Sequence, residues 1–246
     1  MTEFNFPEAD EPLATAIRSA IDYTLARFDS VLGIIVAGSI LHGEGDKNSD
    51  VDTFIIFEGD YRQRIQKFFN GVRFELFANA VEFVPLYFEE ERRTGTPSTA
   101  HMLTTGHLVL NRSPKINDLV QQAQNSLDAG ADYNPKALIS ERYHLADTFE
   151  NAFDLRYRDP HMGLVLLDSI ISGMMVYQFK KHNLWIPRHK DLLNVTREKF
   201  PDLADLIVQY QQSIGDKRFD ASVFIADRTI GTRGFFEWES DKDYLE

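Results

Sequence analysis

Two short patterns within residues 31–57 combine side chains that bind metal ions with side chains that bind phosphate. An apolar run ends in Gly38-Ser39, and after a ten-residue spacer Asp50 and Asp52 open a second apolar run. Because side chains alternate along a strand, these two carboxylates would point the same way, about 6.6 Å apart at a rise of about 3.3 Å per residue. This separation suits a pair of divalent ions, which lie roughly 3.5–4 Å apart where two metals act together.

The Gly38-Ser39 dipeptide has the composition of a phosphate-binding turn. Glycine lets the backbone approach a phosphate closely, and free N–H groups with a serine hydroxyl can bind its oxygens. Alone, such a dipeptide more often forms a plain turn with a helix cap. The acid-x-acid pattern is also weak alone, because the chain holds 38 acidic residues among 246. The prediction therefore depends on the spacing between the two patterns.

Taken together, Gly38-Ser39, the spacer and Asp50-Val51-Asp52 resemble the motif of the DNA polymerase β-type nucleotidyltransferases, and among them the aminoglycoside branch of the kanamycin and streptomycin type. The resemblance is specific over about residues 30–85. It implies transfer of a nucleoside monophosphate, AMP from ATP or its equivalent from another nucleoside triphosphate, to a hydroxyl of a small molecule such as an antibiotic. It also implies two Mg²⁺ ions as cofactors, with Asp50 and Asp52 as metal ligands and pyrophosphate as the leaving group.

In the resembling family a third acid lies in a neighbouring strand, where it binds metal or serves as general base. Glu75, in the alternating stretch 72–77, is the preferred residue for this role. Glu82, in a second alternating stretch at 81–84, is its rival, and an exposed strand face is the alternative for both. Three clustered carboxylates without a cation would raise the pKa of at least one of them by like-charge repulsion, which a metal ion would relieve.

A triphosphate needs cations beyond magnesium. Resembling enzymes often reach it with a lysine of their helical domain, so Lys190 joins Gly38 and Ser39 as a candidate nucleotide-binding residue, with a solvated helix start as the alternative. Arg73, beside Glu75, is a weaker candidate. The spacer is acidic at Glu44 and Asp46, whereas the relatives have arginine-bearing loops at this place. This departure argues against a contribution of the spacer to triphosphate binding.

Three other interpretations stay open. His101 begins a helix after the sheet and could lie near a cleft, although a structural histidine is the more frequent outcome. Arg156 and His161 match an Arg-x4-His spacing found in helical ribonuclease domains that accompany small nucleotidyltransferases, but Pro160 interrupts that segment. A non-catalytic nucleotide-binding or toxin-neutralising module with the same fold is the alternative to an enzyme.

Strands and helices must position these residues, and hydrophobic periodicity predicts an α+β protein in two parts. Residues 1–129 should form a nucleotidyltransferase fold, a mixed sheet of about four to five strands with flanking helices, and residues 130–246 an all-α helical bundle. The expected elements of the first part are a helix at 10–28, strands at 31–36 and 50–57, a helix at 60–69, strands at 72–77 and 81–84 around a turn at Asn79, helices at 87–93 and 98–103, and a strand at 107–110.

Composition limits the partners and the compartment. The chain has no cysteine, which excludes disulfides and cysteine-based zinc sites and fits the cytoplasm, as does an acidic N-terminus unlike a signal peptide. A net charge of −12 disfavours nucleic acid and accommodates a small, even cationic, acceptor.

The most apolar segment, residues 162–179, contains Asp168, and a charge in mid-helix is costly in lipid. We therefore expect a buried helix and no membrane association. This helix would serve either as a homodimer contact or as a monomeric core. The tail with Asp241 and Asp243 is expected to be acidic and frayed.

Overall fold

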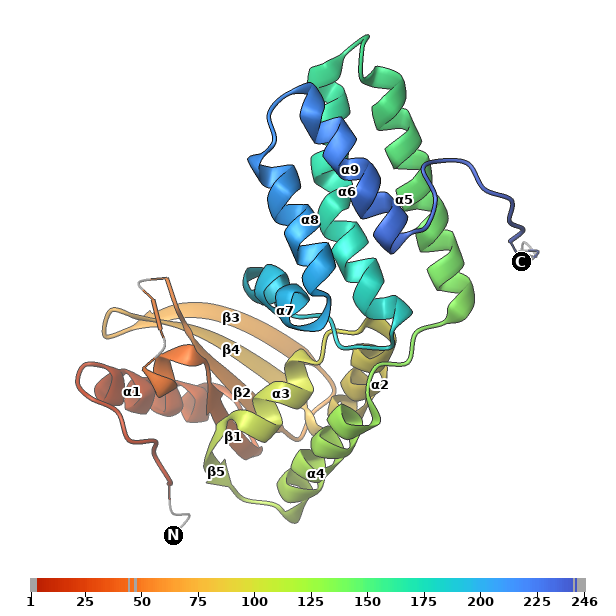
Figure 1. Cartoon of the computed structure of the whole chain (residues 1–246). Coiled ribbons are helices and arrows are strands. Elements are labelled where there is room, and N and C mark those ends of the chain that lie inside the picture. The colour runs from red at the N-terminus through yellow and green to blue at the C-terminus, as the bar shows by residue number, and fades with distance from the viewer. Residues whose placement is uncertain (1–3, 44, 47, 241, 243–246) are drawn as a thin grey trace. The chain divides into compact units, whose positions relative to one another are not determined.

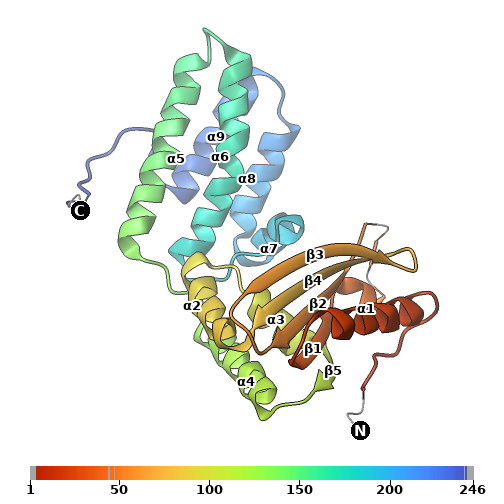
Figure 2. The same ribbon diagram turned by 180° about the vertical axis from the view of Figure 1, so that it is seen from behind.

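The computed structural model describes residues 4–43, 45–46, 48–240 and 242, so the predictions on Glu44, Asp241 and Asp243 lie outside the described residues. The chain divides into two compact units. Unit 1 comprises Met1–Arg92 and Pro97–Ala129, and unit 2 comprises Arg93–Thr96 and Gly130–Glu246. Unit 1 contains a β-sheet with helices, whereas the described part of unit 2 is helical (Figures 1 and 2). The predicted α+β fold class is confirmed.

Five strands form the sheet of unit 1 (Figure 1). They are β1 (Val31–Ala37), β2 (Val51–Phe57), β3 (Arg62–Phe69), β4 (Val72–Ala80) and β5 (His107–Asn111). Their order across the sheet is β3-β4-β2-β1-β5, with β2 and β4 parallel and the other neighbours antiparallel. Strands β1 and β2 are almost entirely buried, which fits their continuous runs of Val, Ile and Phe.

Helices cover both faces of this sheet (Figures 1 and 2). Helix α1 (Leu13–Arg27) packs Ile17 and Ile21 against one face, with Leu76 of β4 in the same cluster. The opposite face packs Phe54 and Ile56 against α2 (Val84–Thr94), α3 (Ser98–Thr105) and α4 (Pro114–Ala129). Since side chains alternate along each strand, Asp52 lies on the second face, the one opposite α1.

The expected helix at residues 60–69 is wrong, because this segment is strand β3. Phe69 and Val72 face each other across a two-residue turn at Asn70-Gly71, where φ is +47° and +80°. Two positive φ angles define the hairpin turn that Asn-Gly favours, since its twist matches that of the flanking strands. The Asn70-Gly71 dipeptide therefore marks a hairpin turn. Tyr61, Ile65 and Phe68 have the spacing of a helix face, although the segment forms a strand.

The expected strand at residues 81–84 and the turn at Asn79 are also wrong. Strand β4 continues to Ala80, and the 3₁₀ helix η2 (Val81–Phe83) then leads into α2. Asn79 lies inside β4, where its Oδ1 accepts a hydrogen bond from the Tyr87 hydroxyl at 3.1 Å. Strand β4 extends this far because Asn79 and Ala80 pair with Ile56 and Phe57 of β2.

Unit 2 has a helical core. Its helices are α5 (Pro135–Leu155), α6 (Pro160–Lys181), α7 (Leu192–Lys199), α8 (Pro201–Gln212) and α9 (Asp216–Thr229), with a 3₁₀ turn η3 (His189–Asp191) before α7. Helix α6 has the length and apolar composition of a membrane span, but half of that apolar window is buried inside the protein. Met174 of α6 packs with Phe149, Tyr210 and Phe219 in this core. Packing within the unit thus accounts for the buried half of this apolar window.

Candidate active site

Three carboxylates meet on the face of the sheet opposite α1. Asp52 of β2 lies opposite Glu75 of β4 in the parallel register, and Asp50 directly precedes β2. One oxygen from each of Asp50, Asp52 and Glu75 lies within 4.8 Å of the others, and all three residues are half-buried. A cluster of carboxylate oxygens at this separation is the donor set that Mg²⁺ prefers.

The electrostatics of the cluster favour a bound cation. Burial, followed by the charges of Asp50 and Glu75, raises the pKa of Asp52 from 3.8 to about 6, and only Arg64 opposes the shift. Carboxylates that repel one another in a half-buried site bind a divalent ion favourably, because the ion relieves the repulsion. The residues present therefore fit magnesium.

Glu75 is held in place by strand β3. Arg64 Nε forms an ion pair with Glu75 Oε1 at 2.7 Å, and Gln66 Nε2, from the residue directly opposite, donates a hydrogen bond to the same oxygen at 3.1 Å. The Arg64 guanidinium also lies 4.5 Å from the centre of the Phe77 ring. The sequence pattern predicts neither β3 residue as part of the site, because it favours a helix for this segment. The Asn70-Gly71 hairpin signal could have revealed both.

The Gly38-Ser39 turn adjoins the carboxylates. Ala37, the last residue of β1, pairs with Asp52, so the chain leaves the sheet beside the acids. Gly38 has φ +115°, and a Cβ at this position would lie 2.9 Å from the backbone oxygen of Asp50. Ser39 begins the 3₁₀ helix η1 (Ser39–His42). Glycine is therefore needed both for the backbone angle and for close approach to the metal-binding segment.

Local hydrogen bonds order the described end of the spacer. Asp46 Oδ1 accepts from the backbone N–H of Asn48 at 2.7 Å, and Ser49 Oγ accepts from the backbone N–H of Asp46 at 2.8 Å. Arg73, exposed on β4, donates from Nη1 to the carbonyl oxygen of Asn48 at 3.4 Å. Asp46 thus shapes the loop that leads into Asp50, and Arg73 ties this loop to the sheet.

Glu82, the rival third acid, lies outside the carboxylate cluster. It belongs to η2 instead of a strand, and its Oε1 pairs with Lys115 Nζ at 3.0 Å on the surface. The expectation that Glu82 alternates in a strand is wrong, because β4 ends before it. His101 is exposed on α3. Lys190 is exposed in η3 of unit 2, and its role stays a prediction.

Arg156 has structural partners in unit 2. Its guanidinium donates to both carboxylate oxygens of Asp216 at 2.6 Å and to Asp220 at 2.8 Å, which connects the end of α5 to α9. These hydrogen bonds raise the pKa of Arg156 above its ordinary value. His161 is exposed at the start of α6. The contact between α5 and α9 therefore explains the arginine of the Arg-x4-His pattern.

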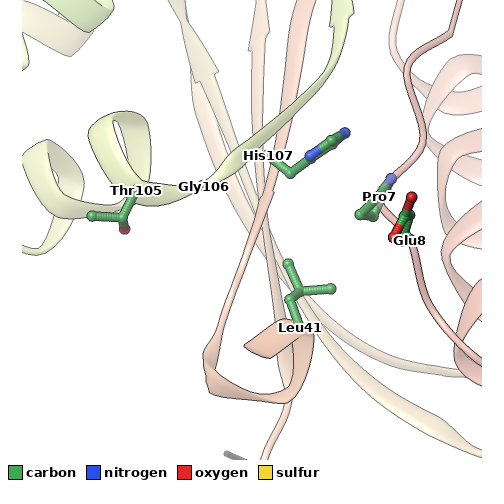
Figure 3. Close-up of a pocket in the computed structure, with 6 residues that line it drawn as sticks. All are labelled: Pro7, Glu8, Leu41, Thr105, Gly106 and His107. Carbon is green, nitrogen blue, oxygen red and sulfur yellow. The ribbon is translucent and has the colours of Figure 1, made fainter. Parts of the chain in front are cut away.

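A separate cavity of about 270 Å³ lies between the N-terminal segment, η1 and the start of β5 (Figure 3). None of the three clustered carboxylates lines it. Asn5 connects the N-terminal segment to β5, because its backbone N–H donates to the Val109 carbonyl oxygen and its own carbonyl oxygen lies 2.9 Å from His107 Nε2. The cavity is lined by Pro7, Glu8, Leu41, Thr105, Gly106 and His107.

Unit 1 thus combines a mixed sheet, a glycine-serine turn and three convergent acids. The family model described as the nucleotidyltransferase domain matches residues 17–101, a region that contains Gly38, Asp50, Asp52 and Glu75. The expected superfamily resemblance is thereby confirmed for this domain. The match supports nucleotidyl transfer as the general activity, while the aminoglycoside branch stays a prediction.

Comparison with solved structures supports the fold over a longer part of the chain. The crystal structure of a nucleotidyltransferase-like protein from Exiguobacterium sibiricum 255-15 is similar over 88% of this chain and 73% of its own, with a TM-score of 0.55 and 12% sequence identity. At this identity the likeness concerns the fold alone. A search among curated proteins finds no match to this chain.

Proposed function

We propose that this protein is a magnesium-dependent nucleotidyltransferase that moves a nucleoside monophosphate, AMP from ATP, to a hydroxyl group of a small molecule. The observation that carries this proposal is the convergence of Asp50, Asp52 and Glu75 beside the Gly38 turn. The domain match over residues 17–101 supports the same general activity. Retention of all three acids favours an enzyme over a non-catalytic nucleotide-binding or toxin-neutralising module.

Each site residue has a distinct task in this reaction. Two magnesium ions held by Asp50 and Asp52, with Glu75 completing the ligand set, would neutralise charge on the α-phosphate and on the departing pyrophosphate. The acceptor oxygen forms a bond to the α-phosphorus while the bond from that phosphorus to the oxygen bridging the β-phosphate breaks. Glu75 accepts the hydroxyl proton, and pyrophosphate leaves with the bridging oxygen.

We infer from the sheet order that the two substrates approach Asp52 from opposite sides. Gly38-Ser39 at the end of β1 lies on one side of Asp52, and its N–H groups and hydroxyl bind the triphosphate. Glu75 lies on the other side, in β4, so the acceptor hydroxyl approaches over β4 and β3. Lys190 stays a predicted cation for the triphosphate. Antibiotic hydroxyls belong to the proposed acceptor class, and we place the protein in the cytoplasm as a monomer or homodimer without nucleic-acid partners.

Calorimetry with ATP and Mg²⁺ tests the assignment. The double variant Asp50→Asn plus Asp52→Asn should lose metal-dependent ATP binding, because both carboxylate charges at the metal site are removed. Glu82→Gln, which removes an exposed acid outside the cluster, is the control and should bind as the parent chain does. Equal affinity in the double variant and the parent would refute the proposal. Incubation with α-labelled nucleotides and pooled hydroxyl compounds then identifies the donor base and the acceptor.

A further inference from the structure

We propose that the open face of β3 and β4 beside Glu75 is the acceptor subsite, and that it selects a small hydroxyl compound carrying an anionic group. This inference rests on the proposed function and names the substrate class of the same site. The subsite consists of Arg64, Gln66 and Phe68 of β3 with Arg73 and Glu75 of β4.

Strand register places these side chains on one face. Gln66 lies opposite Glu75, Phe68 opposite Arg73, and Arg64 opposite Phe77 in the antiparallel pair. Directly opposed residues share a face of the sheet, and residues two apart along a strand share it as well. The five subsite residues therefore lie on the face that carries Asp52, on the side of Asp52 away from the Gly38 turn.

Within unit 1 this end of the face is open. The Arg64 side chain is 65% exposed and Phe68 is 66% exposed, whereas Glu75, at the edge of the carboxylate cluster, is only 14% exposed at its side chain. Elsewhere on the same face, Phe54 and Ile56 are buried beneath α2, α3 and α4. A small molecule can therefore lie over β3 with a hydroxyl directed at the sheltered Glu75.

Within the five-residue subsite two arginines outnumber one glutamate, so its net charge is opposite to that of the chain as a whole. Arg64 uses Nε to hold Glu75, and among the described residues its two terminal NH₂ groups have no hydrogen-bond partner. Arg73 contacts Asn48 through Nη1, and its other guanidinium nitrogens have no hydrogen-bond partner within the described ranges. Guanidinium groups with free N–H donors bind carboxylates and phosphates well, often through paired hydrogen bonds. In a protein of net charge −12, this local basic surface favours an anionic acceptor.

Phe68 supplies the apolar part of the subsite. It is a large, exposed aromatic side chain opposite Arg73, next to the polar residues that face the reaction. Such a ring packs against the flat or apolar side of a sugar or another small ring. A polycation would meet two arginines here, so kanamycin-like compounds should be poor acceptors.

Calorimetry on protein saturated with magnesium and a non-hydrolysable ATP analogue tests this selection. The probes are glucose 6-phosphate, glucose, kanamycin and a short single-stranded oligonucleotide with a free 3′-hydroxyl. We expect glucose 6-phosphate to bind at least about tenfold more tightly than glucose, as one charge-assisted contact provides. Arg64→Gln should remove this preference, measured as the ratio of the affinities for the two sugars on protein saturated with the ATP analogue. Lys67→Gln, on the α1 side of the same strand, is the matched control and should keep the preference for glucose 6-phosphate over glucose.

The outcomes separate this inference from the proposed function. If the ATP analogue binds with magnesium but glucose 6-phosphate binds no better than glucose, or neither sugar binds, the anionic subsite is wrong while the nucleotide site stands. Tightest binding of kanamycin or of the oligonucleotide would likewise overturn it. Failure of the parent chain to bind the ATP analogue with magnesium would contradict the proposed function itself.

Discussion

Asp52 and Glu75 are direct neighbours across the parallel strands β2 and β4. Asp52 is the one partly exposed residue of β2, whose other residues are buried, so its carboxylate leaves the core at the point where Glu75 does. Neighbouring strands lie about 4.8 Å apart, which keeps the two charges close whether or not a cation is present. The backbone hydrogen bonds between β2 and β4 therefore hold the two carboxylates in place before a metal ion binds. The metal-free protein is destabilised by the repulsion between these carboxylates.

Magnesium affinity should depend on pH because Asp52 must lose its proton to bind the ion. Its pKa is about 6 in the metal-free protein. Below that pH the protonated form predominates, so affinity should fall about tenfold for each unit of pH below 6 and level off above 7. Calorimetric titration with Mg²⁺ from pH 5 to pH 8 measures this. A flat profile in the parent chain would contradict the prediction, and in Asp52→Asn the residual affinity should vary much less.

The same residue should make the metal-free protein less stable at neutral pH. The folded-state pKa of Asp52 lies above its ordinary value of 3.8, so its contribution to stability is full below pH 3.8 and is lost as the pH rises through about 6. Asp52→Asn removes the buried charge and should raise the free energy of unfolding at pH 8. A shift of about two pKa units, reduced by solvent screening, gives on the order of 1–2 kcal/mol.

Urea unfolding in the presence of a chelator measures this difference. At pH 4 the parent chain and Asp52→Asn should differ little, because Asp52 is then largely protonated. A gain from Asp52→Asn that was equally large at pH 4 and pH 8 would mean that the charge is not its cause.

Gly38→Ala should damage both stability and nucleotide binding. The φ of +115° is strained for alanine, and the new Cβ would lie 2.9 Å from the backbone oxygen of Asp50. We expect a loss of about 1–3 kcal/mol in the free energy of unfolding and weaker binding of ATP with magnesium, since Asp50 must move. Urea unfolding and calorimetry measure the two effects.

Gly43→Ala is the matched control for this turn. Gly43 also has positive φ, at +72°, but no atom of the described residues lies within 4 Å of the position that an alanine Cβ would take there. The substitution should cost backbone strain alone and keep nucleotide affinity. If Gly43→Ala weakened ATP binding as much as Gly38→Ala, close approach to Asp50 would not be the reason for glycine at position 38.

Glu75→Gln should lower the rate of nucleotidyl transfer by about 100-fold or more, because the amide can neither accept the hydroxyl proton nor bind metal as a carboxylate does. Glu82→Gln should leave the rate unchanged, since Glu82 pairs with Lys115 at the surface. Label transfer from α-labelled ATP to an identified acceptor measures both variants. The reverse ranking of the two variants would assign the third acid to Glu82.

Local sequence is sufficient for much of the fold and for part of the site. Apolar periodicity locates α1, the two buried strands and α6, because each of these patterns lies within one continuous segment. The spacing of Gly38 and Asp50 is equally readable, because consecutive strands β1 and β2 bring the turn and the acids together. Hydrophobic periodicity does not predict strand β3, because Tyr61, Ile65 and Phe68 are spaced like the apolar face of a helix.

The order of amino acids by itself thus determined the glycine-serine turn, the paired aspartates and the α+β class. Only the tertiary structure decided that Glu75 faces Asp52, that Glu82 does not, and that Arg64 and Gln66 hold the third acid. The physical reason is that strand pairing joins residues far apart in the chain. A shift of one residue in register would turn every side chain of β4 to the other face of the sheet. The sequence of β4 alone does not specify which register forms.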